Sequence, residues 1–233
     1  MQDVIIETGA MTQFDSAIES VSGFPGFILA HGQAGRGKSV AADRNYCANG
    51  GAYVRVWQNW TQTAFLQRLL FEVRGKNGDI PRHSGNRCKE LVVEALQAEP
   101  QILHIDEADR LHIDRIEDLR DILEMTGSSI VLIGEEGIFG LLSDRRRIWS
   151  RVVEEVEFGP IQAHEVGIYC LAAAGLSVES KLCAMISDKA EGDFRLVRNM
   201  LILLEKAARA AETDTVDEAM VKAVFAERKW RRK

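Results

Sequence analysis

Two short segments of the chain carry residue types that together can bind a nucleoside triphosphate and direct water at it. The first reads GQAGRGKS and fully matches the pattern G-x-x-x-x-G-K-[ST]. Its glycines let successive N–H groups face phosphates, its lysine reaches the β- and γ-phosphates, and its final hydroxyl holds Mg²⁺. A glycine-rich turn with a capping serine is the plainer interpretation. We predict that the nucleotide is bound by Gly32, Gln33, Ala34, Gly35, Arg36, Gly37, Lys38, Ser39 and Val40.

The second segment, residues 101–107, is a mostly apolar run, QILHIDE, that ends in two acids. Such a run is typical of a buried parallel strand whose carboxyl end opens on a site. Beside a phosphate-binding loop, Asp106 is predicted to bind the water shell of Mg²⁺, as Ser39 binds the ion, and Glu107 to polarise the attacking water. Neighbouring acids also occur on ordinary surface turns. Together the two segments favour a site for ATP and Mg²⁺.

The elements that must position these segments alternate along the first part of the chain. Apolar, strand-like runs are interleaved with segments whose apolar residues recur at helical spacing, which indicates a parallel sheet covered on both faces. Helices are predicted after the phosphate-binding loop and near residues 61–73, 91–96 and 115–125. The five predicted strands are residues 26–30, 52–57, 101–107, 129–134 and 152–158.

After Pro160 the strand signal stops, and helical patterns follow at residues 163–174, 178–190, 194–211 and 216–228. Thr215 is the expected N-cap of the last helix. The predicted fold class is therefore α/β: an ATPase domain at residues 1–159, with a five-stranded parallel sheet between helices, and a small all-helical domain with a basic C-terminal tail at residues 160–233.

Composition limits the classes of protein that fit. The 233 residues include no apolar run of membrane-spanning length and no leader pattern, so we expect a cytoplasmic protein that does not contact a membrane. A formal net charge of -6 argues against a protein that coats nucleic acid with its whole surface, but it allows local basic clusters. The four cysteines form no C-x-x-C pair, which predicts buried thiols rather than metal ligands or disulfides.

A phosphate-loop αβ domain followed by a helical domain resembles the AAA+ ATPases. The resemblance implies that Arg151, just before the fifth strand, is an arginine finger that reaches the ATP of a neighbouring subunit. Arg146 and Arg147 compete for that role, and a structural or solvated arginine is the plainer alternative. A finger neutralises charge that develops on the γ-phosphoryl oxygens.

Two further positions follow from the same resemblance. Arg195, in the string GDFR, would contact the γ-phosphate as sensor 2 and so link nucleotide state to the angle of the helical domain. A capping Asp193 followed by a surface arginine is the alternative. Glu135 stands where many relatives carry Asn, Thr or Ser as sensor 1. Its charge beside phosphates is unfavourable, which implies slow hydrolysis or hydrolysis that needs a partner.

Within the AAA+ proteins the chain resembles the transposition regulators of the phage Mu B, TniB and TnsC type. The resemblance covers most of the chain and rests on the strings ETGAMTQF, HGQAGRGKS, YVRV with NWT, and IGEE. It implies an ATPase that assembles as a helical filament or ring on duplex DNA without reading its sequence, selects target DNA and stimulates a cognate transposase, in a bacterial or phage-infected cell. The ATPase fold is expected to start almost at Met1, without room for the N-terminal DNA-binding domain of the Mu protein. DNA contact is therefore expected from the ATPase domain itself.

Two loops are best placed to face a central duplex, residues 58–62 and residues 76–89. Polar and basic side chains there would bond phosphates without reading bases. Two other functions fit the same motifs: an origin-binding or helicase-loading AAA+ remodeller, and a nucleotide-gated scaffold that binds no DNA. The candidate DNA contacts are Asn59, Thr61, Lys76, Arg82, Arg87 and Lys89.

Overall fold

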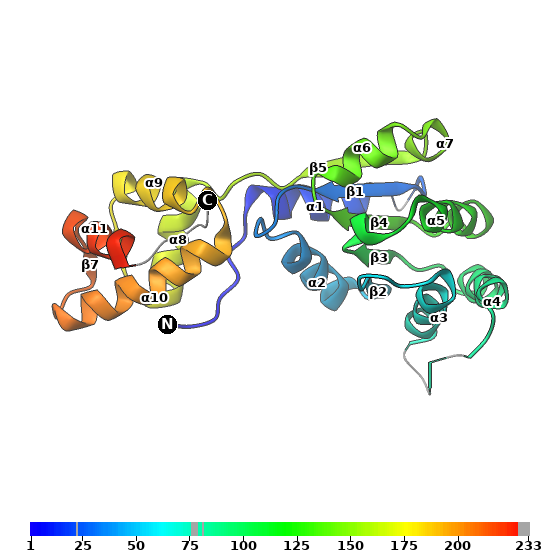
Figure 1. The fold of residues 1–233 in the computed structure, drawn as a ribbon, viewed down its shortest axis with the longest axis horizontal. Helices are drawn as coiled ribbons and strands as arrows, with labels where there is room; N and C mark the ends of the chain where they lie inside the picture. Colours follow the sequence, from blue (N-terminus) through cyan, green and yellow to red (C-terminus); the bar gives the residue numbers. More distant parts are fainter. Residues whose placement is uncertain (22, 76–78, 81, 228–233) are drawn as a thin grey trace. The chain divides into compact units, whose positions relative to one another are not determined.

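The computed structural model describes residues 1–21, 23–75, 79–80 and 82–227. The chain forms two compact units, one built on a sheet and one built from helices (Figure 1). The sheet unit comprises Ala10–Gln33 and Lys38–Phe158, and the helical unit comprises Met1–Gly9, Ala34–Gly37 and Gly159–Lys233. The first nine residues therefore differ from expectation, because they belong to the helical unit, where Ile6 is part of the core.

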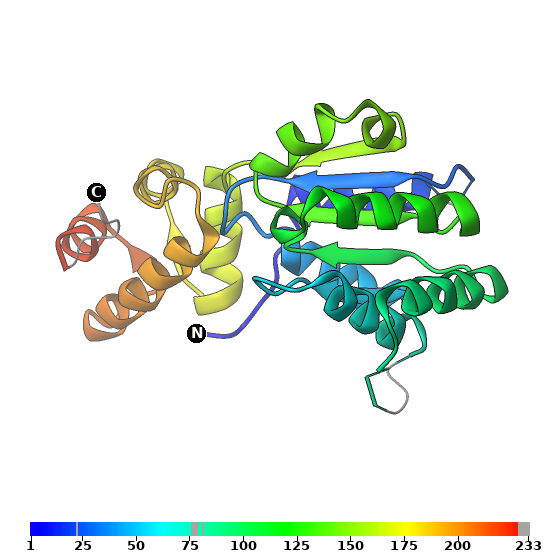
Figure 2. The ribbon, with the colours of Figure 1, turned by 45° about the vertical axis from the view of Figure 1, so that its right-hand side comes forward.

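The sheet confirms the predicted α/β fold. Its five strands are all parallel and lie in the order β2-β3-β4-β1-β5. Figure 2 shows the arrowheads of β1 and β3 at the same edge of the sheet. Side chains at the carboxyl ends of the strands therefore converge there. The strands are β1 (Phe27–His31), β2 (Ala52–Arg55), β3 (Leu103–Asp106), β4 (Ile130–Gly134) and β5 (Val152–Glu157).

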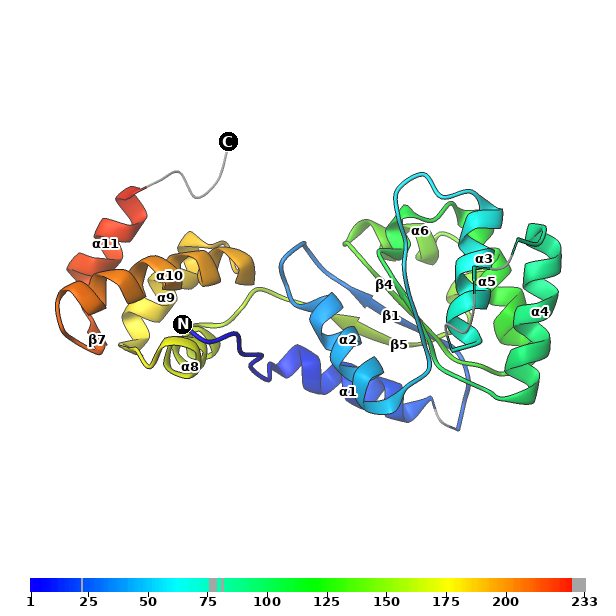
Figure 3. The same ribbon diagram turned by 90° about the horizontal axis from the view of Figure 1, so that it is seen from below.

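Helices cover both faces of the sheet (Figure 3). One face carries α1 (Gly9–Ser20) and α2 (Lys38–Asn49). The other carries α3 (Gln62–Val73), α4 (Gly85–Ala98) and α5 (Ile113–Thr126). A 3-10 turn, η1 (Ala108–Arg110), follows β3, and the short helices α6 (Gly137–Ser143) and α7 (Arg146–Trp149) lie between β4 and β5. Helices α1, α6 and α7 were not predicted from the sequence.

Strand β1 shows why its sequence is apolar throughout. Successive side chains of a strand point to opposite faces, so a strand buried on both faces has no polar side. Phe27 and Leu29 pack in the core under α3, α4 and α5, whereas Ile28 and Ala30 pack in the core under α1 and α2. All four side chains are fully buried.

The described part of the helical unit contains α8 (Ala163–Ala174), α9 (Ser180–Lys189), α10 (Phe194–Ala210) and α11 (Glu218–Glu227). The predicted helical region is confirmed with one addition, a parallel pair of two-residue strands, β6 (Ser177–Val178) and β7 (Thr215–Val216). The predicted N-cap at Thr215 is therefore wrong. Asp217 precedes α11 instead, and its carboxylate accepts the N–H of Met220 at 2.8 Å.

The cysteines follow the prediction of buried thiols in three of four cases. Cys88, Cys170 and Cys183 are buried, but Cys47 on α2 is exposed, so the prediction was wrong for Cys47. No helix in the described part of the chain combines the length and the apolar character needed to cross a bilayer.

Burial in the central sheet predicts a difference between two valines of the sheet unit. Val131 on β4 is fully buried, whereas Val153 on β5 is 45% exposed. Val131→Ala should lower the free energy of unfolding by about 2 kcal/mol, because about two methyl groups of buried surface are lost and a cavity remains. Val153→Ala should cost less than about 1 kcal/mol. Urea unfolding followed by circular dichroism measures both, and equal losses would contradict this assignment of the core.

Candidate nucleotide-binding and hydrolysis site

The phosphate-binding loop joins the end of β1 to the start of α2, as predicted. Gly32 and Gly37 have φ angles of 145° and 93°, a region that favours glycine. A Cβ at Gly32 would lie 2.4 Å from the carbonyl oxygen of Phe158, so this position also lacks room for a side chain. At Gly37 no atom lies within 4 Å of a Cβ, so conformation alone favours glycine there. Lys38, Ser39 and Val40 then form the first turn of α2, whose free N–H groups suit an anion.

Lys38 lies folded over this loop. Its side chain is buried, and its Nζ donates to the carbonyl oxygens of Gly32 at 2.6 Å and Gln33 at 2.8 Å. Burial lowers the pKa of Lys38, and nearby carboxylates, of which Glu135 has the largest effect, oppose that shift. The ammonium therefore lies among negative groups at the end of the loop, where a contact with terminal phosphates remains our prediction.

Ser39 and Asp106 come together from different elements. The Ser39 hydroxyl on α2 donates to Oδ1 of Asp106, the last residue of β3, at 3.1 Å. Asp106 is only 2% exposed. A hydroxyl next to a carboxylate fits Mg²⁺, which prefers oxygen ligands and keeps several of its waters. The donor set is thus compatible with the predicted roles, in which Ser39 holds the ion and Asp106 holds its water shell.

The other oxygen of Asp106 has two partners that were not predicted from the sequence. Its Oδ2 accepts from the Tyr53 hydroxyl and from Nε of Arg55, both at 2.8 Å. Both residues belong to β2, the neighbour of β3. Burial raises the pKa of Tyr53, and the charge of Asp106 raises it further, so the phenol remains a neutral donor. Alternation along a strand puts Tyr53 and Arg55 on one face of the sheet, but only the strand order brings them to Asp106.

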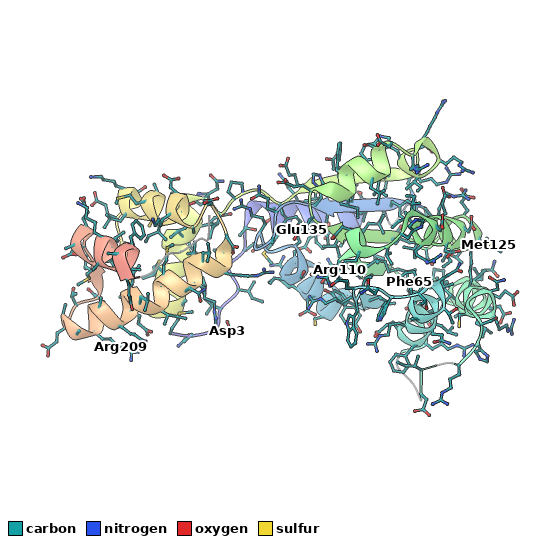
Figure 4. All side chains as sticks on the ribbon, in the orientation of Figure 1. Asp3, Phe65, Arg110, Met125, Glu135 and Arg209 are labelled. Atoms are coloured by element: carbon teal, nitrogen blue, oxygen red, sulfur yellow. The ribbon has the colours of Figure 1, made fainter. Side chains whose placement is uncertain are left out.

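Glu107 is held by a neighbour in sequence. It adopts a left-handed φ of 59°, and its carboxylate pairs with Arg110 at 3.0 Å. Arg110 also donates to the carbonyl oxygen of Val56, just after β2, at 3.2 Å. Figure 4 shows Arg110 and Glu135 at the same end of the sheet. Arg110 was not among the predicted site residues, although it follows the two acids closely in the string DEADR.

Glu135 follows β4 and is exposed. Its backbone N–H donates to Oδ1 of Asp109 at 3.1 Å. The same Oδ1 would lie 2.7 Å from a Cβ at Gly134, so Asp109 fits closely against the end of β4. This contact fixes the backbone that carries Glu135. The sensor 1 role of its side chain stays a prediction.

Two of the three arginines predicted for the subunit interface, Arg147 and Arg151, lie against acids of α5. Arg151 forms an ion pair with Glu124 and donates to the carbonyl oxygen of Arg147. Arg147 lies 4.0 Å from Glu117, and Arg146 is exposed. An ion pair within its own protomer does not by itself favour Arg151 over the two alternatives, and the finger remains a prediction.

Arg195 lies in the first turn of α10. Its backbone N–H donates to the carboxylate of Asp193 at 2.8 Å, so Asp193 caps this helix. The Arg195 side chain is exposed. A capping aspartate followed by a surface arginine was the alternative to sensor 2, and the contact with phosphate stays a prediction.

The candidate DNA contacts occupy different surroundings. Asn59, in a left-handed conformation with φ of 66°, and Arg82 are both exposed. Thr61 caps α3 by accepting the N–H of Ala64 at 3.2 Å. Lys76 lies outside the described residues, as does the tail from residue 228 onward.

Arg87 and Lys89 already contact carboxylates. Arg87 pairs with Glu90 at 2.8 Å. Lys89 pairs with Asp118 at 3.0 Å and with Asp121 at 2.6 Å. Burial acts to lower the pKa of Lys89, but the two aspartates outweigh it and raise that pKa. Much of the positive charge of Lys89 is therefore balanced within the protein.

The loop between β1 and α2, the acids at the end of β3 and the parallel strand order define the class of P-loop nucleotide-binding proteins. Residues 24–142 match the family model described as "AAA domain". The chain therefore belongs to the AAA domain family, and it is an AAA+ ATPase by class. The predicted AAA+ fold and the resemblance to transposition regulators are confirmed.

The chain is also similar to a curated transposition protein. It is 26% identical over 158 residues to the "Mu-like prophage FluMu DNA transposition protein B" of Haemophilus influenzae, a match that covers 64% of the chain and 54% of that protein. The chain thus spans about half the length of this curated relative.

Among solved structures, the fold is similar to Cdc6p of Pyrobaculum aerophilum, with a TM-score of 0.67, 19% identity, 92% of this chain and 65% of the other. The ORC1 protein of Aeropyrum pernix, solved in complex with DNA, has a TM-score of 0.63 and 17% identity, and the match covers 97% of this chain and 66% of the other. The RuvB branch migration motor of Thermotoga maritima has a TM-score of 0.58 and 15% identity, and the match covers 95% of this chain and 69% of the other. At these identities the three structures show the shared fold.

Two substitutions separate the binding of the nucleotide from its hydrolysis. Lys38→Ala should abolish ATP binding, because it removes the ammonium that the loop is predicted to place on the terminal phosphates. Glu107→Gln should keep binding and lower the hydrolysis rate by about 10²-fold or more, since a general base is worth about 10² to 10⁴. A labelled ATP analogue measures binding and phosphate release measures turnover. ATP turnover at the parent rate in Glu107→Gln would show that the assignment of Glu107 is wrong.

Proposed function

We propose that this protein hydrolyses ATP while assembled on duplex DNA, that it selects target DNA for transposition, and that it activates a cognate transposase. The observation that carries the ATPase proposal is the convergence of Lys38, the Ser39–Asp106 pair and Glu107 at one edge of the sheet. The DNA and transposase parts are supported by the similarity to a protein whose name is DNA transposition protein B.

The chain's own side chains suggest how hydrolysis would proceed. Lys38 would bind the terminal phosphates, and Glu107 would accept a hydrogen bond from water and orient it for attack. When bound, Mg²⁺ would neutralise charge on the phosphate oxygens. Glu107 is paired with Arg110, so this pair would have to loosen before Glu107 could act on water. Slow hydrolysis that a partner accelerates is consistent with that pairing.

Assembly would supply the remaining cation. An arginine from a neighbouring protomer, Arg151 or its alternatives Arg146 and Arg147, would stabilise the charge that builds up on the γ-phosphoryl group. Assembly into a helical filament or a ring is part of the proposal, as is a cytoplasmic location. A loader or remodeller that acts at specific sites is the alternative function, and it fits the same AAA domain.

A mixing experiment tests whether Arg151 acts across protomers. Arg151→Ala should lower ATPase activity by about 10³-fold and leave nucleotide affinity nearly intact. Adding the Lys38→Ala variant should restore activity, since a mixed interface pairs an intact loop with an intact arginine. Glu124→Gln is the matched control, because it breaks the Arg151–Glu124 pair and keeps the arginine. If mixed oligomers form without any rescue, Arg151 does not act in trans.

DNA binding should depend on ATP and fall steeply with salt. Each neutralised phosphate releases condensed counterions, so the slope of log K against log salt reports the number of phosphate contacts. Arg82→Gln should reduce that slope by about one if the second loop faces DNA. Lys89→Gln should reduce it less, because Lys89 already pairs with two aspartates.

Fluorescence anisotropy with duplexes of unrelated sequence measures these slopes. Binding without nucleotide, binding insensitive to salt, or binding confined to one sequence would contradict the proposal. The last result would favour the site-specific loader.

A further inference from the structure

Both oxygens of the Asp106 carboxylate are fully used within the protein. Oδ1 accepts from the Ser39 hydroxyl at 3.1 Å and from the N–H of Glu107 at 3.0 Å. Oδ2 accepts from the Tyr53 hydroxyl and from Nε of Arg55, both at 2.8 Å, and Nη2 of Arg55 also lies 2.8 Å away. An ionised carboxylate offers about four lone-pair sites. Any water of a Mg²⁺ shell that bonds to Asp106 must therefore displace a donor or share an oxygen with it.

Arg55 is the charged member of this set. Parallel pairing places it directly opposite Asp106, at the end of the edge strand β2. Its side chain is 53% exposed, whereas that of Asp106 is 2% exposed. The guanidinium therefore reaches from the sheet edge onto a buried carboxylate, with solvent available on its other side. A guanidinium keeps its charge at any ordinary pH, so Arg55 always places a positive charge at this carboxylate while the two are in contact.

A divalent ion at Ser39 and the guanidinium of Arg55 carry charge of the same sign and share one carboxylate. Repulsion between charges a few ångströms apart remains strong where part of the surroundings is protein rather than water. The carboxylate that attracts the ion is also partly neutralised by Arg55. Both effects lower the affinity of the site for Mg²⁺. Tyr53 bonds the same oxygen as Arg55 but brings no charge.

We propose that Arg55 limits the Mg²⁺ affinity of the site by competing with the ion for the Asp106 carboxylate. This inference rests on the proposed nucleotide-binding function. It gives β2, through Arg55, a part in setting the Mg²⁺ affinity, in addition to the phosphate-binding loop and the acids after β3. Removal of Arg55 leaves Asp106 with its full negative charge available to the ion.

The test measures the Mg²⁺ concentration that gives half-maximal binding of a fluorescent, non-hydrolysable ATP analogue to the full chain. Arg55→Gln should lower this midpoint about tenfold, because one positive charge next to the ion is removed. Arg55→Lys keeps the charge and should shift the midpoint less. Tyr53→Phe removes a neutral donor from the same oxygen and should leave the midpoint within about twofold of the parent.

Arg68→Gln is the matched control, since Arg68 on α3 pairs with another buried carboxylate, Glu72, in the same unit. It should leave the midpoint unchanged. Thermal melting without nucleotide shows whether each variant folds, and Arg55→Lys carries the test if Arg55→Gln does not. Arg55→Lys moves the positive charge relative to Asp106. A lower Mg²⁺ midpoint in this variant supports competition between residue 55 and the ion.

An unchanged or higher midpoint in folded Arg55→Gln, or in Arg55→Lys where only that variant folds, overturns the inference. Higher midpoints in both Arg55→Gln and Tyr53→Phe would show instead that these residues orient the carboxylate for the ion. If the parent fails to bind the analogue at any Mg²⁺ concentration, the proposed function fails, and this inference fails with it.

Discussion

The buried negative charge of Asp106 is the constraint on which the geometry of the site depends. Moving a carboxylate out of water is costly unless hydrogen bonds replace its hydration. Here the replacement comes from the first turn of α2, from β2 and from the backbone after β3. The same bonds thereby fix the start of α2, the neighbouring strand and the turn that carries Glu107 relative to one another. Hydrogen bonding to one buried anion therefore positions the elements that carry the site.

The site also gathers more negative than positive charge. Asp106, Glu107, Asp109 and Glu135 all act on the pKa of Lys38, the buried cation of the loop. A triphosphate would add further negative charge to this edge of the sheet. Cations from outside the loop would therefore be needed: a divalent ion for tight binding of ATP, and an arginine of another protomer for its hydrolysis. On this argument the acidic surroundings of Lys38 make the proposed activity dependent on assembly.

The sequence predicted the elements whose signal is local. The loop at residues 32–39, the acids after β3 and the five strands follow from spacing and apolar runs, and they were found. The bonds of Arg55 and Tyr53 to Asp106 depend on which strands are neighbours and in what register, which a local pattern does not contain. The two-residue strands at Ser177 and Thr215 are too short to show alternation. The helix α1 does carry helical spacing, in Met11, Phe14 and Ile18, and periodicity alone would have identified it.

Basic clusters in a sequence overstate the positive charge that a surface offers to DNA. Lys89, Arg87 and Arg151 were all candidates for contacts outside the protomer, yet each contacts carboxylates of its own chain. Arg82 is exposed, and the chain as a whole carries a formal net charge of -6. Because most of the basic candidates in the described part of the chain already contact carboxylates, one protomer would gain little from the phosphate contacts that these residues can make. Many protomers assembled along one duplex would multiply those contacts, because each further contact is made at high effective concentration. Assembly is therefore the physical route by which an acidic chain of this kind would bind DNA without reading its bases.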